Sequence, residues 1–127
     1  HLKRRKETMK QRIEIIEQAI KDNKRWSEIE MNPTFGQAYI YSLEAENDLP
    51  NFAEVIWDYD IEAIIADCKH YGITEFTISS TFSSLITTIA KFEELGCKLE
   101  CIVKINSRHT DFRTGEKEII PAFKMSI

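Results

Sequence analysis

Hydrophobic and polar positions follow their clearest pattern between Ile73 and Cys101. Phe76 and Ile78 alternate with polar neighbours, which is typical of a half-buried strand. Apolar residues at spacings of three and four then predict a helix, which carries Phe82, Leu85, Ile86, Ile89, Phe92 and Leu95 on one face. Gly96 is placed to end this helix. A second strand follows, with one face formed by Cys97, Leu99, Cys101, Val103 and Ile105. We predict that the two strands are parallel.

The C-terminal pattern predicts an antiparallel hairpin. Residues 98–106 form one arm and residues 118–127 the other, and a turn over 111–116 places Gly115 at a positive φ. Pro121 has no N–H group to donate, so we expect the last strand to lie at a sheet edge or to be bulged.

The N-terminal part of the chain is predicted to be helical. Over residues 3–30 an apolar stripe that includes Met9, Ile13, Ile16 and Ile20 predicts one long helix with a heptad register for only about two heptads. Two interpretations stay open: the helix packs on its own domain, or it allows self-association as a homodimer.

Three shorter helices are predicted next, over residues 34–48, 52–57 and 61–71, with Pro50 and Gly72 as stops. The first of them has one face of Phe35, Ala38, Tyr39, Ser42 and Ala45. The fold class is therefore α+β, with N-terminal helices followed by a β-α-β-β unit that forms a small mixed sheet of about three strands. We divide the chain into a helix over 1–30 and a single domain over 31–127.

Composition sets broad limits on the setting of the protein. With 127 residues, 43% of them hydrophobic, the chain is long enough to bury a real core. It lacks a run of roughly 18 apolar residues, so we expect no membrane span. The three cysteines are an odd number and fall on predicted core faces, which favours free thiols and a cytoplasmic location.

The formal net charge is −4, and the charged residues are unevenly distributed along the chain. The interval from Trp26 to Cys68 contains no Lys or Arg but many carboxylates. If these share a surface, they favour a basic protein partner, such as a nucleic-acid-binding protein whose groove the acidic face occupies. The residues that we assign to this surface are Glu44, Glu46, Asp48, Glu54, Asp58 and Asp60. Neighbouring aromatic residues are candidate interface anchors: Tyr39, Tyr41, Trp57 and Tyr59.

Two other binding modes are alternatives to this interaction module. A Ser/Thr-rich turn over 79–84 lies where a strand feeds a helix, which is a place for a small anionic ligand such as phosphate, bound by a simple binding protein or an enzyme. Its candidate ligand-binding residues are Ser79, Ser80, Thr81 and Ser83, although capping of the following helix is the favoured role of these hydroxyls. The basic residues from Lys3 to Arg12 suggest nucleic-acid binding, which the negative charge of the remaining chain disfavours.

Catalytic and metal-binding signatures are weak. The sequence has no nucleophile elbow, zinc-protease motif or glycine-rich phosphate loop. Cys68, His70, Cys97 and Cys101 lack the usual zinc spacing. His109 and Asp111, with Arg108 and Arg113 in the hairpin loop, form only a weak candidate for a small catalytic or binding cluster. We therefore favour a non-enzymatic role and assign no catalytic residue, metal or cofactor.

The stretches GITEFTISSTFSSLITTIAKFEELGCKLE and TGEKEIIPAFKMSI carry a resemblance to a known group. Residues 33–127 resemble small uncharacterised proteins of mobile elements and phages in gut Firmicutes. The resemblance implies a mobile-element context, in which an accessory or host-inhibiting factor is expected, and it brings no established activity or site residues.

Overall fold

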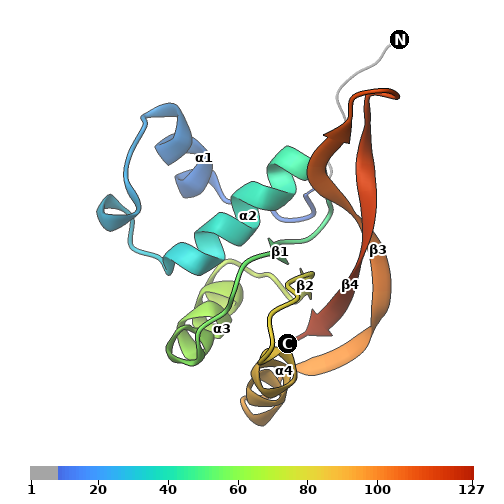
Figure 1. Cartoon of the computed structure of the whole chain (residues 1–127). Coiled ribbons are helices and arrows are strands. Elements are labelled where there is room, and N and C mark those ends of the chain that lie inside the picture. Colours follow the sequence, from blue (N-terminus) through green and yellow to red (C-terminus); the bar gives the residue numbers. More distant parts are fainter. Residues whose placement is uncertain (1–8) are drawn as a thin grey trace.

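A computed structural model describes residues 9–127, which form an α+β fold (Figure 1). The element order is α1 (Glu14–Lys21), the 3-10 helix η1 (Trp26–Glu28), α2 (Pro33–Ala45), β1 (Asn51–Phe52), the 3-10 helix η2 (Asp58–Asp60), α3 (Ile61–His70), β2 (Glu75–Ile78), α4 (Leu85–Glu94), β3 (Lys98–Asp111) and β4 (Glu116–Ser126). The predicted fold class is confirmed, but the sheet has four strands where about three were expected.

The strands follow the order β1-β2-β4-β3 across the sheet. β1 pairs with β2 in parallel, and β4 runs antiparallel to both β2 and β3. β2 and β3 are therefore parallel to each other, as predicted, but β4 separates them. Of the two alternatives predicted for β4, the edge position is wrong, whereas the ladder between β3 and β4 does contain register shifts, between Leu99 and Cys101 and between Asn106 and Thr110. Pro121 is tolerated inside the sheet because the short β2 pairs only with residues 123–126 of β4 and ends before it reaches the proline.

The strand that the sequence pattern missed is β1. A helix over 52–57 was expected there, but the carbonyl oxygens of Pro50 and Phe52 accept hydrogen bonds of 2.9 Å from the N–H groups of Thr77 and Ser79. Phe52 and Ile56 are both buried and lie four positions apart in the sequence, which is a helical spacing. Here, however, Phe52 belongs to β1 and Ile56 to the loop that follows it. Pairing with a distant strand has overridden the local pattern.

The N-terminal helix is much shorter than predicted. Within the described residues, α1 covers only Glu14–Lys21, and the helix ends where Asn23 adopts a left-handed φ of 57°. Met9, Ile13 and Ile16 are buried in the same hydrophobic core as α2 and α3, so this segment packs on its own domain. Residues 3–8 of the predicted helix lie outside the described part, and self-association stays a prediction.

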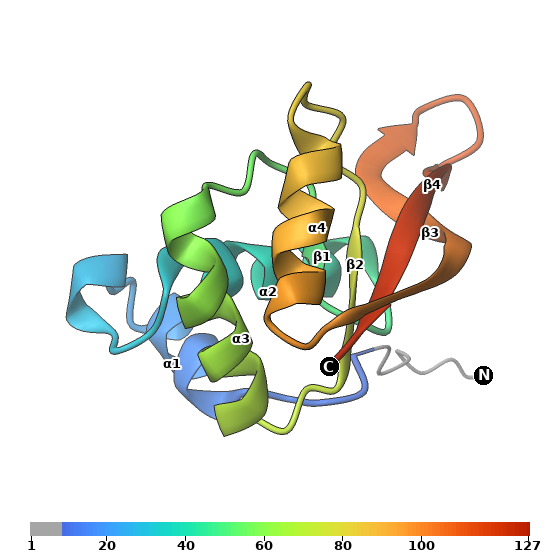
Figure 2. The same cartoon turned by 90° about the horizontal axis from the view of Figure 1, so that it is seen from below.

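Helices cover the sheet on two sides. β1 and β2 lie between α2 on one side and α3 with α4 on the other (Figures 1 and 2). Phe76 of β2 lies at the centre of the core, with its ring centroid 5.4 Å from that of Phe52 and 5.3 Å from that of Phe92. The predicted inward face of α2 is confirmed, since its five residues are all buried.

The helices α1 to α4 of the described residues all end in the same kind of turn, with a residue at positive φ just after the helix. After α3 and α4, Gly72 and Gly96 have φ values of 72° and 102°, as the sequence predicted. The N–H groups of Ile73 and Cys97 then reach back to the carbonyls of Cys68 and Phe92, at 2.8 and 3.0 Å. These are Schellman motifs, in which buried side chains at both ends of the 6→1 bond hold the following strand in place.

Two predictions around α4 and β3 need correction. The helix begins at Leu85 without a side-chain cap, so Ser80, Thr81 and Ser83 are not its caps, and Ile86 is 83% exposed. Cys101 is exposed because the register of β3 shifts between Leu99 and Cys101, which transfers it to the face of Lys124. The turn prediction at Gly115 is confirmed by its φ of 75°.

Candidate functional site

A hollow with a volume of about 450 Å³ lies along α2. We call it the α2 groove. One wall is the outer side of α2, and the opposite wall is β1 with the segment that follows it. Its lining consists of Pro33, Thr34, Gln37, Ala38, Tyr41, Asn51, Phe52, Ala53, Glu54, Val55 and Arg108. A volume of this size accommodates one or two large side chains or a small ligand.

Carboxylates surround this groove. Glu54 lines it directly, and Glu44 lies beside it, bound to Arg108. Asp60 borders the N-terminal end of the groove, where it accepts hydrogen bonds from Asn32 and Thr34 at 3.0 and 3.2 Å. These two neutral donors leave the negative charge of Asp60 in place. Three of the six predicted acidic residues therefore lie in or beside the α2 groove, namely Glu44, Glu54 and Asp60, and a fourth, Asp58, belongs to η2 two residues before Asp60.

Aromatic side chains add flat surfaces near the groove. Tyr41 is half-buried in its lining, while Trp57 and Tyr59 follow on the exit segment of β1 and are 56% and 80% exposed. Their rings are stacked with centroids 6.5 Å apart and an interplanar angle of 3°. Such an exposed, pre-ordered pair is a suitable anchor for a partner side chain. Tyr39, the fourth predicted anchor, is fully buried and cannot serve as one.

Glu46 and Asp48 belong to a different hollow. They line a depression of about 370 Å³ between the end of α2 and the hairpin, together with Lys10, Lys104 and Lys124. Glu75 in the same depression forms ion pairs with Lys10 at 3.7 Å and Lys124 at 3.4 Å. The three lysines offset the negative charge there. The predicted acidic residues thus form two groups, and only the group at the α2 groove is strongly acidic.

The Ser/Thr-rich turn has its hydroxyls partly engaged. Ser80 is buried, with its Oγ at 2.9 and 2.6 Å from the carbonyl oxygens of Phe52 and Glu54. The Oγ of Ser79 accepts a 2.9 Å bond from Asn51. Thr81 and Ser83 are exposed. This turn holds the exit of β1 against the end of β2, and ligand binding at it stays a prediction.

The basic N-terminal cluster is only partly described. Lys3 to Lys6 lie outside the described residues, and Lys10 pairs with Glu75. Arg12 donates two hydrogen bonds to the Glu17 carboxylate, of 2.6 and 2.7 Å. The same carboxylate accepts a hydrogen bond of 2.6 Å from the Tyr39 hydroxyl. The Arg12 hydrogen bonds lower the pKa of Glu17, while burial raises the pKa of Tyr39 to about 12. This network fastens α1 to α2, because Tyr39 also accepts from the N–H of Ile13 at 2.8 Å.

The weaker candidates are only partly brought together. In the hairpin, His109 and Asp111 line a hollow of about 470 Å³, and Arg113 pairs with Asp111 at 3.8 Å, whereas Arg108 is separated from them because it points to Glu44. Burial raises the pKa of Cys68 to about 12, which leaves this thiol unreactive at neutral pH. Between residues 9 and 127 we find no group of three or more metal-ligating side chains. Nor does this part of the chain contain a helix that is long and apolar enough to cross a membrane.

Arg108 is the site residue that sequence reasoning misassigned. It was placed in the hairpin loop, whereas β3 extends to Asp111 and carries Arg108 back to the C-terminal half of α2. The sequence offers no clear signal for this extension, because residues 106–111 are all polar and show no alternation of apolar and polar positions.

Comparison with known proteins identifies the family of the chain. No curated protein and no solved structure gives a significant match. A family model described as a domain of unknown function, DUF7698, matches residues 34–127, which include the whole sheet, α2 from its second residue on, and every residue that lines the α2 groove except Pro33. The chain therefore belongs to the DUF7698 family.

Proposed function

We propose that this protein is a non-enzymatic protein-interaction module that binds a basic segment of a partner protein in the α2 groove. The observation that carries the proposal is the way in which the groove already holds a guanidinium group. Arg108 lies with Nη1 3.1 Å from the Glu44 carboxylate and with Cζ 5.0 Å from the centre of the Tyr41 ring. A carboxylate beside an aromatic face is a favourable site for such a cation.

The charge around the groove supports the same kind of partner. Glu54 and Asp58 are exposed, and within the described part of the chain neither side chain forms a hydrogen bond or ion pair. Their charges are therefore available to attract a positive partner and to speed its association. Trp57 and Tyr59 lie beside them and offer faces on which the aliphatic stems or guanidinium groups of the partner can stack.

The biological setting that we propose follows the family resemblance. A mobile-element factor that blocks a host protein would gain from mimicking the negative charge of a nucleic acid. Basic segments that bind nucleic acids are the natural targets of such a surface. A cytoplasmic location suits this role and suits the three free thiols of Cys68, Cys97 and Cys101.

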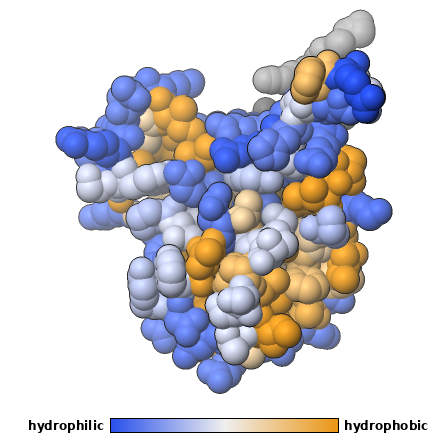
Figure 3. All heavy atoms as spheres, in the orientation of Figure 1, coloured by the Kyte–Doolittle hydropathy of each residue, from blue (hydrophilic) through white to orange (hydrophobic). Residues whose placement is uncertain are grey.

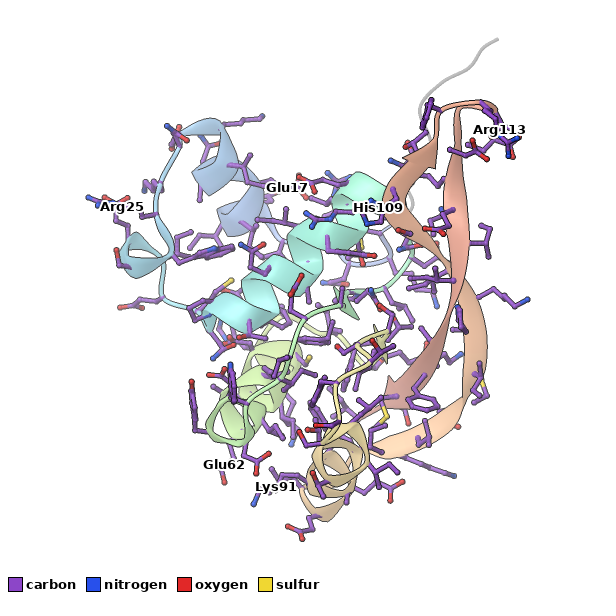
Figure 4. The ribbon with its side chains drawn as sticks, viewed as in Figure 1. Glu17, Arg25, Glu62, Lys91, His109 and Arg113 are labelled. Carbon is purple, nitrogen blue, oxygen red and sulfur yellow. The ribbon has the colours of Figure 1, made fainter. Side chains whose placement is uncertain are left out.

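The test is a binding titration with charge-reversed variants. Fluorescein-labelled hexa-arginine is titrated with the full chain at about 0.15 M salt, where weak surface attraction is screened, and fluorescence polarisation is recorded. The groove variant carries Glu54→Lys and Asp58→Lys. The matched control carries Glu93→Lys and Glu94→Lys at the end of α4, which is exposed and lies away from α2 (Figures 1 and 4, where Lys91 marks α4).

Both variants change the net charge by the same amount, so they separate a local site from general attraction. We expect the groove variant to lose at least about tenfold in affinity, as removal of close charge pairs does at interfaces, and the control to bind as the wild type does. Equal losses in the two variants, or an absence of saturable binding by the wild type, would reject the proposal.

A further inference from the structure

We infer that the α2 groove is self-occupied in the free protein: Arg108 fills the arginine subsite formed by Glu44 and Tyr41, and an arginine of the partner must displace it. This inference rests on the proposed function and adds the residue type that is recognised and the step that regulates access. It makes Arg108 a resident competitor and not a contact for the partner.

The geometry of Arg108 is that of a bound ligand. Its guanidinium group approaches the aromatic face of Tyr41 while one of its nitrogens binds Glu44, and both partners come from α2, far from Arg108 in sequence. A planar guanidinium combines these two contacts in one group, whereas the compact ammonium group of lysine does so less well. The subsite therefore fits arginine.

The strand that carries Arg108 is held independently of Arg108 itself. Two residues earlier, the backbone N–H and carbonyl of Asn106 form hydrogen bonds of 2.9 Å with the side chain of Asn47. The side-chain amide of Asn106 donates a further hydrogen bond of 3.0 Å to the Ala45 carbonyl. This clamp fixes β3 to the end of α2. Arg108 can therefore leave its subsite by rotation of its own side chain, without movement of the hairpin.

The contacts of Arg108 are strong enough to compete but weak enough to break. Its side chain is 48% exposed and that of Glu44 is 56% exposed, so solvent screens the ion pair. Pairs of this kind and exposed cation–π contacts are each modest. Removal of the competitor should therefore raise the affinity for an arginine ligand by about three- to tenfold.

The experiment compares Arg108→Ala with a charge-matched variant, Arg113→Ala. Arg113 lies on the same hairpin but at its tip, far from α2 (Figure 4), where it pairs only with its neighbour Asp111 among the described residues. Fluorescein-labelled hexa-arginine and hexa-lysine are each titrated with the wild-type chain and with both variants, and fluorescence polarisation is recorded. We expect Arg108→Ala to bind hexa-arginine about three- to tenfold more tightly than Arg113→Ala, with a smaller gain for hexa-lysine.

Failure of this inference can be told from failure of the proposed function. If Arg108→Ala binds no more tightly than Arg113→Ala while reversal at Glu54 and Asp58 still weakens binding, the groove is a site but Arg108 does not compete for it. If the reversal has no effect in either background, the proposed function itself is wrong. An NMR signal of the Arg108 Nε–H group that stays unchanged on saturation with hexa-arginine would also overturn the displacement step.

Discussion

Glu46 is the residue whose backbone is least suited to its side chain. It ends α2 in the left-handed region, at φ 62° and ψ 44°, where α3 and α4 use glycine. A side chain with a Cβ atom costs about 1–2 kcal/mol in this conformation. The negative charge of Glu46 also lies at the C-terminal end of a helix dipole, where it is unfavourable.

Replacement of Glu46 by glycine should therefore stabilise the protein by about 1 kcal/mol. Denaturation by urea measures this gain as a higher midpoint. Glu46→Ala is the control, since it removes the charge but keeps the Cβ atom and should gain only a few tenths of a kcal/mol. If glycine is no better than alanine, the conformation at this position is not strained. Binding of hexa-arginine should be unchanged in both variants, because Glu46 lies outside the α2 groove.

Glu17 makes the stability of the fold depend on pH. Hydrogen bonds from Arg12 hold its pKa in the folded state below the unfolded value of about 4.3. The ionised carboxylate therefore stabilises the folded state above about pH 4.3, and this contribution is lost as the pH falls through the folded pKa.

Glu17→Gln should flatten the fall in stability between about pH 5 and pH 3 and should lower stability at neutral pH. Thermal or urea unfolding at several pH values gives both quantities. Glu14→Gln provides the comparison, as Glu14 is exposed on the same helix and forms no described hydrogen bond or ion pair. An identical pH profile for Glu17→Gln and the wild type would mean that the network does not fasten α1.

At the scale of elements, the N-terminal segment packs on α2 where the ring of Trp26 lies against Gly36. A Cβ atom added at Gly36 would lie 2.3 Å from the ring of Trp26, which belongs to η1. The close approach explains why α2 contains a glycine in its first turns, although glycine lowers helix propensity by about 1 kcal/mol relative to alanine.

Gly36→Ala should therefore destabilise the wild type by about 1 kcal/mol, since overpacking outweighs the gain in propensity. In a Trp26→Ala background the clash is absent, and Gly36→Ala should then stabilise the folded protein by up to about 1 kcal/mol. A double-mutant cycle of unfolding free energies measures this reversal of sign. The same effect of Gly36→Ala in both backgrounds would show that η1 does not pack on α2 in solution.

Elements with strong local signals were the ones that the sequence predicted well. The ends of α3 and α4 at Gly72 and Gly96 and the turn at Gly115 were all predicted, because glycine at a positive φ is a local requirement. β1 was missed since its two residues are defined only by pairing with β2. The long N-terminal helix failed because Asn23, a tolerable left-handed residue, ends α1 without a glycine or proline to mark the position.

At the scale of the whole molecule, charge and hydrophobicity are separated over the surface. In Figure 3, hydrophilic and intermediate side chains lie over much of α2, whereas hydrophobic patches lie beside α1, along the flank of the hairpin and around β2 and α4. The sequence predicted which residues carry the negative charge, since the interval from Trp26 to Cys68 lacks Lys and Arg. It did not predict that the fold would place lysines beside Glu46 and Asp48. Nor did it predict that Arg108 would lie beside Glu44, because all these contacts are long-range.

An NMR titration tests the central claim, a specific site for basic segments in the α2 groove, most directly. Hexa-arginine is added to the ¹⁵N-labelled full chain at about 0.15 M salt. We predict saturable shifts at the amides of Thr34, Gln37, Tyr41 and Val55 and at the indole N–H of Trp57. Shifts that centre on Asn47 to Leu49, or that spread over all exposed carboxylates without saturation, would contradict the account and leave the acidic interval with a role in solubility alone.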